Sequence, residues 1–450
     1  MSVARLTSSL SLVCLFSLGC GGPADRTPPQ LTPENELSPG VEPPSETTLL
    51  SGPDAYATES EARFTFNGPK ESYECRLDEG DWEPCESPAT YSDLDEGARV
   101  FGLRGVDAQG SAEAEPVYWY WAVDTTPDGV LGTAPKRFYF DVEEHSVWLP
   151  YAANRPVDRN ADDITRLLIA IHGTSYSAWQ FLENGVLAAE DADKLDETLV
   201  VAPQILRADE VEEIVDDEML YWAGFPFWGS QRAYLGSEPV ELQISAFEAL
   251  DRLLIDFAST TRFPNLDEVV VFGHSGGGQF SNRYATANPV DLPGERPTGV
   301  NLRYVVSAPS SFVYFDDRRY DADSGSFVVP ENAPEDYNEY GFGLDELYAY
   351  LADQADADEF RQRYDQRTVY YLVGSDDNDP HDETLSTSPG AVMQGDHRVE
   401  RMERYYDHLA DHFGSQIYNR QHMAIVPDAT HWGQRIMRSD EGLEALFGTP

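Results

Sequence analysis

The sequence predicts a mixed α/β protein with a large, mostly parallel sheet and flanking helices, preceded by a small all-β sandwich. Beyond about residue 136, short apolar runs of strand length alternate with stretches of helical periodicity, which is typical of a parallel sheet. Between residues 52 and 124, apolar and polar residues alternate in short segments separated by Gly, Asp and Pro, which is typical of a sandwich. A length of 450 residues leaves room for two or three domains.

The chain is strongly acidic. It holds 80 Asp and Glu against 31 Lys and Arg, a formal net charge of −49, and the acidic residues are spread along its length. Such a polyanion is poorly suited to bind nucleic acid or anionic lipid through charge, so we expect neither as an electrostatic partner. We interpret the charge as a solvated acidic surface, which says little about the reaction.

The N-terminus, residues 1–19, is predicted to be a targeting segment that lies outside the fold. Arg5 precedes an apolar stretch, Leu10–Leu18, that is too short to span a bilayer. The following Gly19-Cys20, with the Pro-rich tract after it, resembles the end of a bacterial lipoprotein signal. That resemblance implies an exported protein that a lipid on Cys20 anchors to a membrane. Ser17 stands where such signals usually carry leucine, so cleavage with full secretion remains the alternative.

A Pro-rich linker over residues 20–50 is predicted to lead into a β-sandwich over residues 51–126. Cys75 and Cys85 flank a turn in this exported part of the chain, which predicts a disulfide. The segments RFTFNG, GVDAQG and YWYWAVDTTP resemble bacterial immunoglobulin-like repeats. This resemblance implies a stalk, or a module that contacts a surface polymer or protein, without chemistry of its own. The clearest strands are Ala62–Phe66, Ser72–Leu77, Arg99–Val106 and Val117–Val123.

Residues 130–450 are predicted to form the α/β domain. Lys136–Asp141 and Ser146–Pro150 predict an opening hairpin, and Val240–Ala258 carries apolar residues at the spacing of an amphipathic helix. The buried strands that we expect are Arg166–Ile171, Leu199–Pro203, Val269–Phe272, Arg303–Ser307, Thr368–Val373 and Met423–Val426.

The segment Val269–Gln279, VVVFGHSGGGQ, is the centre of the predicted site. Its four apolar residues run into a G-x-S-x-G motif with Ser275 at the middle, and a helix is expected to follow. Strand, sharp turn and helix in this order indicate a nucleophile elbow, with Ser275 as the nucleophile. A plain β-to-α turn is the alternative, and it would require the other catalytic groups to be missing.

A serine nucleophile needs a base and an acid that orients the base. His431 follows the last predicted strand on a loop, where functional side chains of open α/β sheets collect. The acid is expected after the strand Thr368–Val373, where Asp376, Asp377 and Asp379 compete. Asp377, three positions after Gly374, resembles the acid of known serine hydrolases in its spacing, and this resemblance favours it over Asp379 and then Asp376. The remaining aspartates of this loop, together with Asp382, leave a Ca²⁺ site as a minor alternative.

The oxyanion needs two backbone donors. Gly276, directly after the nucleophile, is expected to supply one. The dipeptide His172-Gly173 ends an apolar strand, so the second donor is expected at Thr174, with Ser175 as the fallback.

With these motifs, the C-terminal part of the chain resembles the α/β-hydrolase superfamily, and within it exported esterases that act on polyester or aryl esters. The resemblance implies catalysis by Ser275, Asp377 and His431, no cofactor, and a small or polymeric ester as substrate. A serine peptidase with the same triad and an inactive surface-binding protein remain alternatives. The segment QGDHRVER, Gln394–Arg401, is similar to a stretch found in uncharacterised bacterial hydrolases of this type.

Two further groups of residues are candidates for a functional role. The aromatic run that contains Trp222, Phe225 and Trp228 is a candidate pocket wall, with buried packing as the alternative. His408 and His412 are four residues apart with an acid between them, but the pattern departs from metalloprotease motifs. We therefore expect a solvated helix face there and no metal.

Overall fold

The computed structural model describes residues 47–53, 56–57, 59–78, 80–94, 97–113, 116–123, 134, 136–158, 160–174, 176–208, 211, 217–229, 232–236, 239–292 and 299–448. The predicted signal segment, Cys20 and most of the predicted linker lie outside these residues. The first strand, β1, begins at Thr48, slightly before the predicted end of the linker.

The N-terminal described part is a small all-β unit of two sheets. Their strand orders are β1-β3-β6 and β2-β8-β7-β4-β5. The two sheets share one apolar core, in which Phe64 and Phe101 stack with ring centroids 3.9 Å apart beside Trp121. The expected disulfide between Cys75 and Cys85 is present and joins β4 to β5. The strands are β1 Thr48–Ser51, β2 Tyr56–Ala57, β3 Ala62–Asn67, β4 Ser72–Leu77, β5 Glu83–Cys85, β6 Ala89–Tyr91, β7 Gly97–Val106 and β8 Val117–Val123.

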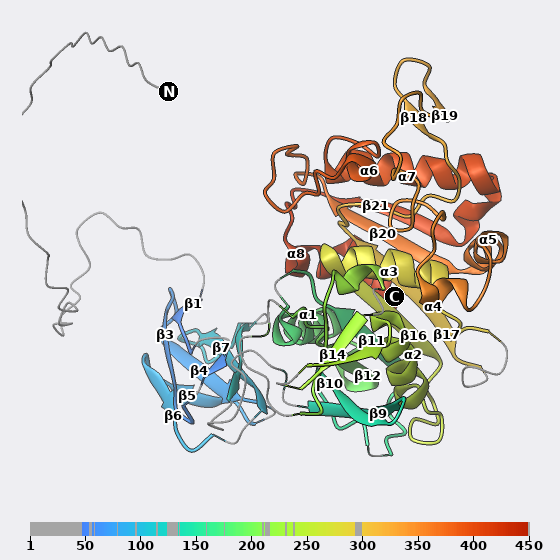
Figure 1. Ribbon diagram of the computed structural model, residues 1–450. Helices are drawn as coiled ribbons and strands as arrows, with labels where there is room; N and C mark the ends of the chain where they lie inside the picture. The colour runs from blue at the N-terminus through green and yellow to red at the C-terminus, as the bar shows by residue number, and fades with distance from the viewer. Residues whose placement is uncertain are drawn as a thin grey trace, which may run out of the picture. The chain divides into compact units, whose positions relative to one another are not determined.

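The α/β domain is built on an eight-stranded sheet in the order β21-β20-β17-β16-β11-β12-β10-β9 (Figure 1). The six strands from β21 to β12 run parallel, and the hairpin β10-β9 is antiparallel at one edge. The strands are β9 Lys136–Val142, β10 His145–Ala153, β11 Arg166–Ile171, β12 Thr198–Pro203, β16 Glu268–His274, β17 Asn301–Ser307, β20 Thr368–Gly374 and β21 Gln421–Val426. The predicted mixed α/β class with a mostly parallel sheet is therefore confirmed, as is the opening hairpin.

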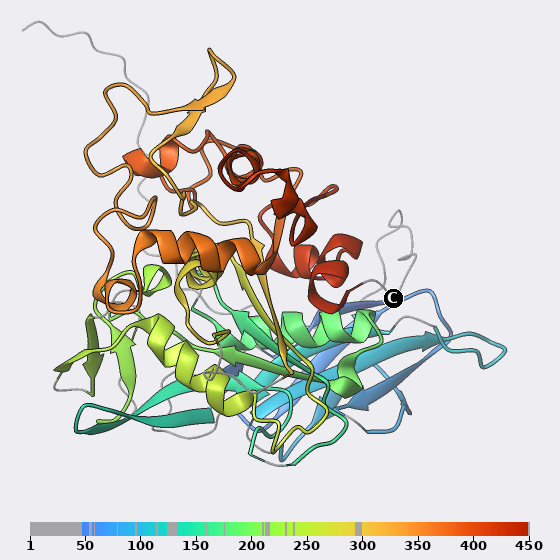
Figure 2. The same cartoon turned by 90° about the vertical axis from the view of Figure 1, so that its right-hand side faces the viewer.

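Helices cover both faces of this sheet (Figure 2). Helix α1 lies on β11 and β12 and contacts α8 and α9, which reach β20 and β21. Helix α3 lies on β16 and β17 and contacts α5. The helices are α1 Ala178–Asp191, α2 Ala246–Phe257, α3 Gly276–Ala287, α4 Ala349–Ala352, α5 Ala357–Gln366, α6 Pro389–Val392, α7 Arg398–Phe413, α8 Gly433–Met437 and α9 Asp440–Phe447, with the short 3-10 turns η1 Leu195–Glu197, η2 Pro226–Trp228 and η3 Ser415–Asn419.

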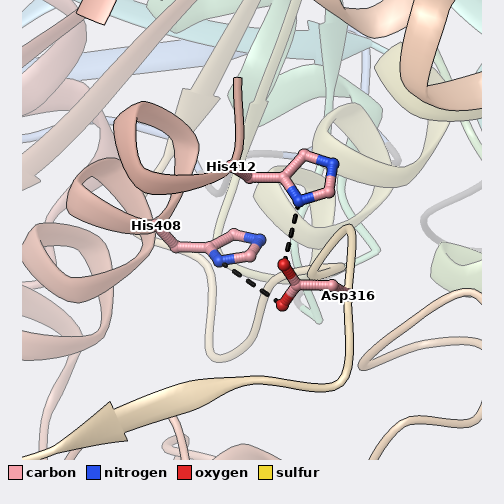
Figure 3. A group of neighbouring side chains, drawn as sticks. All are labelled: Asp316, His408 and His412. Carbon is pink, nitrogen blue, oxygen red and sulfur yellow. Dashed lines mark hydrogen bonds and ion pairs between the residues drawn. The ribbon is translucent and has the colours of Figure 1, made fainter. Parts of the chain in front are cut away.

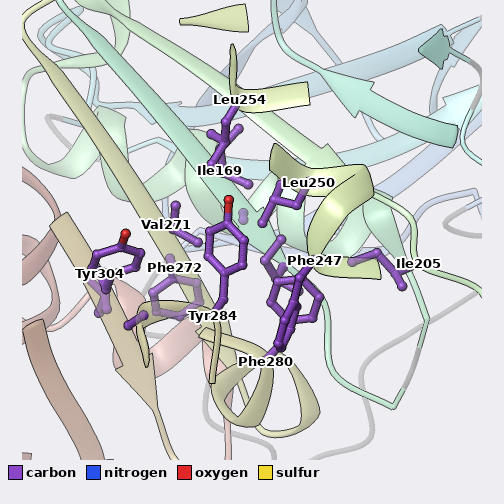
Figure 4. Close-up of a cluster of buried hydrophobic side chains, with 14 of the residues drawn as sticks. Ile169, Ile205, Phe247, Leu250, Leu254, Val271, Phe272, Phe280, Tyr284 and Tyr304 are labelled. Carbon is purple, nitrogen blue, oxygen red and sulfur yellow. The ribbon is translucent and has the colours of Figure 1, made fainter. Parts of the chain in front are cut away.

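The core of the domain lies between α2, α3 and the central strands (Figure 4). Phe247 and Leu250 of α2 are fully buried against Phe280 of α3, with Phe247 and Phe280 edge to face at 4.7 Å between ring centroids. Each such side chain contributes roughly 1.5–3 kcal/mol by leaving water. This packing holds β16 and α3, which carry the predicted nucleophile, on a rigid support.

The predicted helix over Val240–Ala258 is wrong at its start. Residues Val240–Gln243 form the strand β15, which pairs with β14. The helix begins only at Ala246, because the Ser245 hydroxyl accepts a hydrogen bond from the Phe247 N–H at 3.1 Å and caps the first turn. Helical periodicity alone did not reveal this cap. The three-stranded sheet contains β13 Leu220–Trp222, β14 Arg232–Leu235 and β15.

A hairpin of β18 Arg319–Asp321 and β19 Ser326–Val328 projects from the α/β domain (Figure 1). No helix among the described residues is long and apolar enough to cross a membrane.

Candidate active site

Ser275 occupies a strained turn between β16 and α3. Its backbone has φ 58° and ψ −116°, a combination that a residue with a side chain adopts only where the surroundings enforce it. Glycine is required on either side: a Cβ on Gly277 would collide with the carbonyl oxygens of Ile171 and His172, and one on Gly273 would collide with Gly277. The turn therefore presents Ser275 at the carboxyl end of the central strand.

Asp377 and His431 meet at the same edge of the sheet. Asp377 follows β20, His431 follows β21, and Asp377 Oδ2 lies 2.7 Å from His431 Nδ1. Asp377 is only 5% exposed, whereas Asp376 and Asp379 are exposed. His431 Nε2 is buried and has no hydrogen-bond partner among the described residues. One nitrogen of the ring is thus held by a carboxylate, and the other is free to exchange a proton.

The end of β11 lies against the serine turn. A Cβ on Gly173 would stand 3.3 Å from the Cβ of Ser275 and 3.7 Å from the Gly276 nitrogen. The Gly173 carbonyl accepts from the Tyr176 N–H at 3.1 Å and lies 2.8 Å from His172 Nδ1. Because the C=O and the following N–H of a trans peptide point in opposite directions, the Thr174 N–H faces away from these partners. Ser175, the fallback donor, lies outside the described residues.

The neutral ring of His172 holds this loop in place through hydrogen bonds. It is fully buried, and its Nε2 accepts the Ile205 N–H at 2.8 Å, so the proton of the neutral ring is on Nδ1. Burial lowers the pKa of His172 to about 4, although the hydrogen bond to Gly173 acts in the opposite direction. The ring therefore orients the Gly173 carbonyl without adding charge to the site.

His274 lies beside His431, with ring centroids 4.7 Å apart. Its Nδ1 is 2.9 Å from the Ser307 hydroxyl. Burial, followed by the charges of His431 and Arg398, holds the pKa of His274 well below its usual value. A neutral ring in this place supports His431 without opposing its protonation.

Arg398, which sequence reasoning did not single out, contacts the candidate acid. It is 1% exposed and donates from Nη1 to Asp377 Oδ1 at 3.1 Å and to Asp382 Oδ1 at 3.2 Å. The segment QGDHRVER that contains it was the available signal. Two carboxylates of the proposed calcium loop thus already bind a cation. Among the described residues, that loop provides no group of three ligands within reach of one metal ion.

The three predicted aromatic residues have different environments. Trp222 is fully buried and donates its indole N–H to the Ile244 carbonyl at 3.0 Å, so it belongs to the core and cannot meet a ligand at the surface. Phe225 and Trp228 are partly exposed, and Trp228 donates to Gln279 Oε1 at 3.0 Å. Trp432, next to His431 and 56% exposed, was missed. Its position in the chain was the only available signal.

His408 and His412 do not form the expected solvated face. His408 is fully buried, and both rings point toward Asp316 from the loop before β18 (Figure 3). His412 Nδ1 is 2.9 Å from Asp316 Oδ2, while His408 Nδ1 is 4.0 Å from the other oxygen. Asp316 is far away in the sequence, which is why the helix pattern did not suggest a third group.

These three residues are close enough to hold a metal ion, but their bonding fits an internal link better. His408 Nε2 accepts the Phe315 N–H at 3.1 Å, so the proton of the neutral ring is on Nδ1, and neither nitrogen offers a lone pair. The Arg318 guanidinium binds Asp316 Oδ2 at 2.6 Å. We interpret the cluster as a tie between α7 and the loop at residue 316.

No protein-family model and no curated protein matches the chain. Among solved structures, poly(aspartic acid) hydrolase-1 from Sphingomonas sp. KT-1 is similar at 18% identity and a TM-score of 0.42, over 67% of this chain and 95% of that one. The poly(3-hydroxybutyrate) depolymerase LpqC from Bordetella parapertussis is similar at 19% identity and a TM-score of 0.42, over 68% of this chain and 87% of that one. Siderophore hydrolase EstB from Aspergillus nidulans is similar at 14% identity and a TM-score of 0.34, over 73% of this chain and 98% of that one. At such TM-scores these similarities do not indicate a reaction or a substrate for this chain.

Proposed function

We propose that this protein is a serine hydrolase of the α/β-hydrolase type that cleaves carboxylic esters through an acyl-enzyme on Ser275. The observation that carries the proposal is the pair Asp377–His431, joined at 2.7 Å, whose free and buried Nε2 lies at the sheet edge that presents Ser275. A carboxylate, an oriented imidazole and a hydroxyl on a strained turn are the parts that nucleophilic acyl transfer needs.

The reaction proceeds in two halves. As Ser275 Oγ bonds to the ester carbonyl carbon, its proton moves to His431 Nε2, and Asp377 stabilises the imidazolium. His431 then gives this proton to the leaving alcohol as the carbon–oxygen bond breaks. A water molecule next loses a proton to His431 and attacks the acyl group. When the tetrahedral intermediate collapses, the carboxylic acid leaves and the proton returns to Ser275.

The tetrahedral intermediates need donors for the oxyanion. We assign this role to the backbone N–H groups of Gly276 and Thr174. The position of Gly173 against Ser275, and the orientation of its carbonyl by His172, support this assignment. Preorganised backbone donors of this kind are each worth about a factor of 10²–10³ in kcat.

The substrate is proposed to be a carboxylic ester with an apolar acyl or aryl group. Trp432 offers an exposed apolar surface beside His431, which suits an acyl or aryl group of an ester, whether small or part of a polymer.

We further propose that the protein is exported and that a lipid on Cys20 anchors it to a membrane. The disulfide Cys75–Cys85 supports an oxidising compartment. We assign the small β unit to the immunoglobulin-like sandwiches, as a spacer or docking module, and its two sheets on one core support this. Labelling with an alkyne fatty acid in a bacterial host tests the anchor: Cys20→Ser should abolish the label, and an unlabelled wild-type protein would rule out lipidation.

A fluorophosphonate probe, used together with p-nitrophenyl acetate and butyrate, tests the reaction. We expect the wild-type protein to be labelled and to hydrolyse both esters, and Ser275→Ala to lose both properties. Ser324→Ala, at an exposed serine of the β18–β19 turn, is the matched control and should behave as wild type. A folded wild-type protein that neither reacts with the probe nor hydrolyses esters would refute the proposal.

A further inference from the structure

Arg398 and His431 hold opposite oxygens of the same carboxylate. Asp377 Oδ1 accepts from Arg398 Nη1 at 3.1 Å, and Asp377 Oδ2 lies 2.7 Å from His431 Nδ1. The same guanidinium also donates to Asp382 Oδ1 at 3.2 Å and to Thr384 Oγ1 at 2.8 Å. The plane of the carboxylate is therefore fixed from two sides, and one arginine ties it to a second point of the same loop.

The placement of Arg398 is not explained by stability. It is the first residue of α7, where the positive end of the helix dipole disfavours a cation. It is 1% exposed, and its Nε–H has no hydrogen-bond partner among the described residues. Burying a guanidinium is expensive unless it is fully paired, so a structural role alone would be served better by an apolar residue.

The segment that carries Arg398 is itself rigidly held. The Gln394 side chain bonds both the N–H and the C=O of Phe312, each at 2.8 Å. Arg401 Nε donates to the Gly395 carbonyl at 2.8 Å, and Arg401 is also buried. The conformation of residues 394–401 thus fixes where the Arg398 guanidinium lies.

We propose that Arg398 is a positioning residue for the catalytic acid: it fixes the orientation of Asp377 toward His431, and Asp382 neutralises its charge. The proposal rests on the proposed function. It also explains the segment QGDHRVER, to which the sequence assigned no role.

Asp382 offsets the effect that the Arg398 cation would otherwise have on His431. Arg398 alone would oppose formation of the imidazolium, because a second cation would lie behind the carboxylate. Asp382 gives this cation a partner of its own, so the charge of Asp377 remains available to His431. Although its partial burial acts in the opposite direction, Thr384 and Arg398 hold the pKa of Asp382 below its usual value, which keeps it ionised. His274, the other titratable ring against His431, is neutral because burial lowers its pKa.

Three substitutions separate geometry from charge. Arg398→Lys keeps the cation but loses the planar fork, so kcat should fall about 10- to 100-fold while the acid limb of the kcat/KM–pH profile stays in place. Arg398→Met removes the cation, so the acid limb should also move to higher pH by about half a unit. Asp382→Asn removes the anion, so the limb should move to lower pH by a similar amount, about half a unit.

The measurement is hydrolysis of p-nitrophenyl butyrate between pH 5 and 9, with thermal unfolding of each variant as the test of folding. Asp379→Asn, at an exposed acid of the same loop, is the matched control and should leave the profile unchanged. A fall in kcat of Arg398→Lys with an unmoved acid limb, together with shifts of opposite sign in Arg398→Met and Asp382→Asn, supports the proposal.

The outcomes distinguish a failure of the role of Arg398 from a failure of the proposed hydrolase function. If wild type hydrolyses the ester, Ser275→Ala does not, and Arg398→Lys with Asp382→Asn match wild type, then only the role of Arg398 is refuted. If Arg398→Met fails to fold, the decision rests on Arg398→Lys and Asp382→Asn. A wild-type protein without hydrolysis refutes the proposed function and this inference together.

Discussion

Gly173 lies directly against Ser275: a Cβ on Gly173 would stand 3.3 Å from the Cβ of Ser275 and 3.2 Å from the carbonyl oxygen of His274. Gly173→Ala should therefore push the loop that carries the Thr174 N–H away from the serine and remove one oxyanion donor. We expect kcat for p-nitrophenyl butyrate to fall about 10- to 100-fold, with KM changed less.

Ser324→Ala, at an exposed residue of the β18–β19 turn, is the control for this experiment. Its kcat should equal that of wild type. Wild-type kcat in a folded Gly173→Ala variant would show that this loop does not serve the oxyanion.

The sheet could be predicted from the sequence because its central strands are buried on both faces. Residues 269–272 of β16 are apolar and buried throughout, and so are residues 167–171 of β11 and 199–203 of β12. The start of α2 could not be predicted from periodicity, since the hydroxyl of Ser245 decides it. Strand order was also beyond reach, because it depends on pairing between segments that are distant in the sequence.

The residues of the candidate site could be predicted where they belong to a local sequence motif. Residues that only the fold brings together could not be predicted. Ser275 directly follows β16, His431 lies on the loop five residues beyond the end of β21, and Asp377 lies three residues beyond Gly374. Arg398 belongs to a helix that begins 21 residues after Asp377, and only the fold brings the two together. The helix pattern misassigned His408 for the same reason, because the loop that buries it is distant in the sequence.

Trp432 is expected to select the substrate. It is 56% exposed and adjacent to His431 in the chain, and we expect it to contact the acyl or alcohol group without taking part in the chemistry. For Trp432→Ala we expect KM for p-nitrophenyl butyrate to rise about 3- to 10-fold, with a smaller effect on the acetate ester and little change in kcat. Initial rates with both esters test this, and Val328→Ala, at an exposed residue of the β18–β19 hairpin, is the control. Equal effects on both esters would contradict a role in chain-length recognition.

Asp251 should make stability depend on pH. Burial raises its pKa to about 7, although the hydroxyls of Tyr350 and Tyr284 donate to it at 2.6 and 2.7 Å and act in the opposite direction. The folded state therefore binds this proton more tightly than the unfolded state. The resulting stability is fully present below about pH 4 and is lost as pH rises through 7.

Asp251→Asn removes this dependence. Relative to wild type, the free energy of unfolding of the variant should rise between pH 4 and 8, by up to about 4 kcal/mol. Urea unfolding at several pH values measures it, and Asp353→Asn, at an exposed aspartate, should show a constant difference. A constant difference in Asp251→Asn would mean that the buried carboxyl titrates as it does in the unfolded chain.

The disulfide Cys75–Cys85 should stabilise the small β unit. It closes a loop with a sequence separation of 10, and the entropy that such a cross-link removes from the unfolded chain corresponds to about 3 kcal/mol of stability. In the double variant Cys75→Ser and Cys85→Ser, amide hydrogen exchange in β4 and β7 should accelerate by about two orders of magnitude. Exchange in β16 serves as the internal control and should not change. Equal exchange in β4 with and without the disulfide would contradict the expectation.

His172 should destabilise the protein in acid, opposite in sign to Asp251. Its pKa is lowered to about 4, so between pH 4 and the usual value of 6.5 the unfolded state binds more protons than the folded state. Stability is then lost as pH falls through this window, by up to about 3 kcal/mol. Asp251 changes the free energy of unfolding with pH in the opposite direction over much of the same range. The free energy of unfolding of the wild-type protein is therefore expected to vary less with pH than the contribution of either residue alone.

His172→Gln isolates the histidine contribution, because the glutamine carbonyl oxygen can still accept the Ile205 N–H. The difference in unfolding free energy between the variant and wild type should favour the variant progressively as pH falls from 6.5 to 4. Urea unfolding measures this difference, and His381→Gln, at an exposed histidine, should show none. If the His172→Gln difference does not change with pH, the ring is protonated as easily in the folded protein as in the unfolded chain. The interpretation that a neutral His172 ring orients the Gly173 carbonyl would then be wrong.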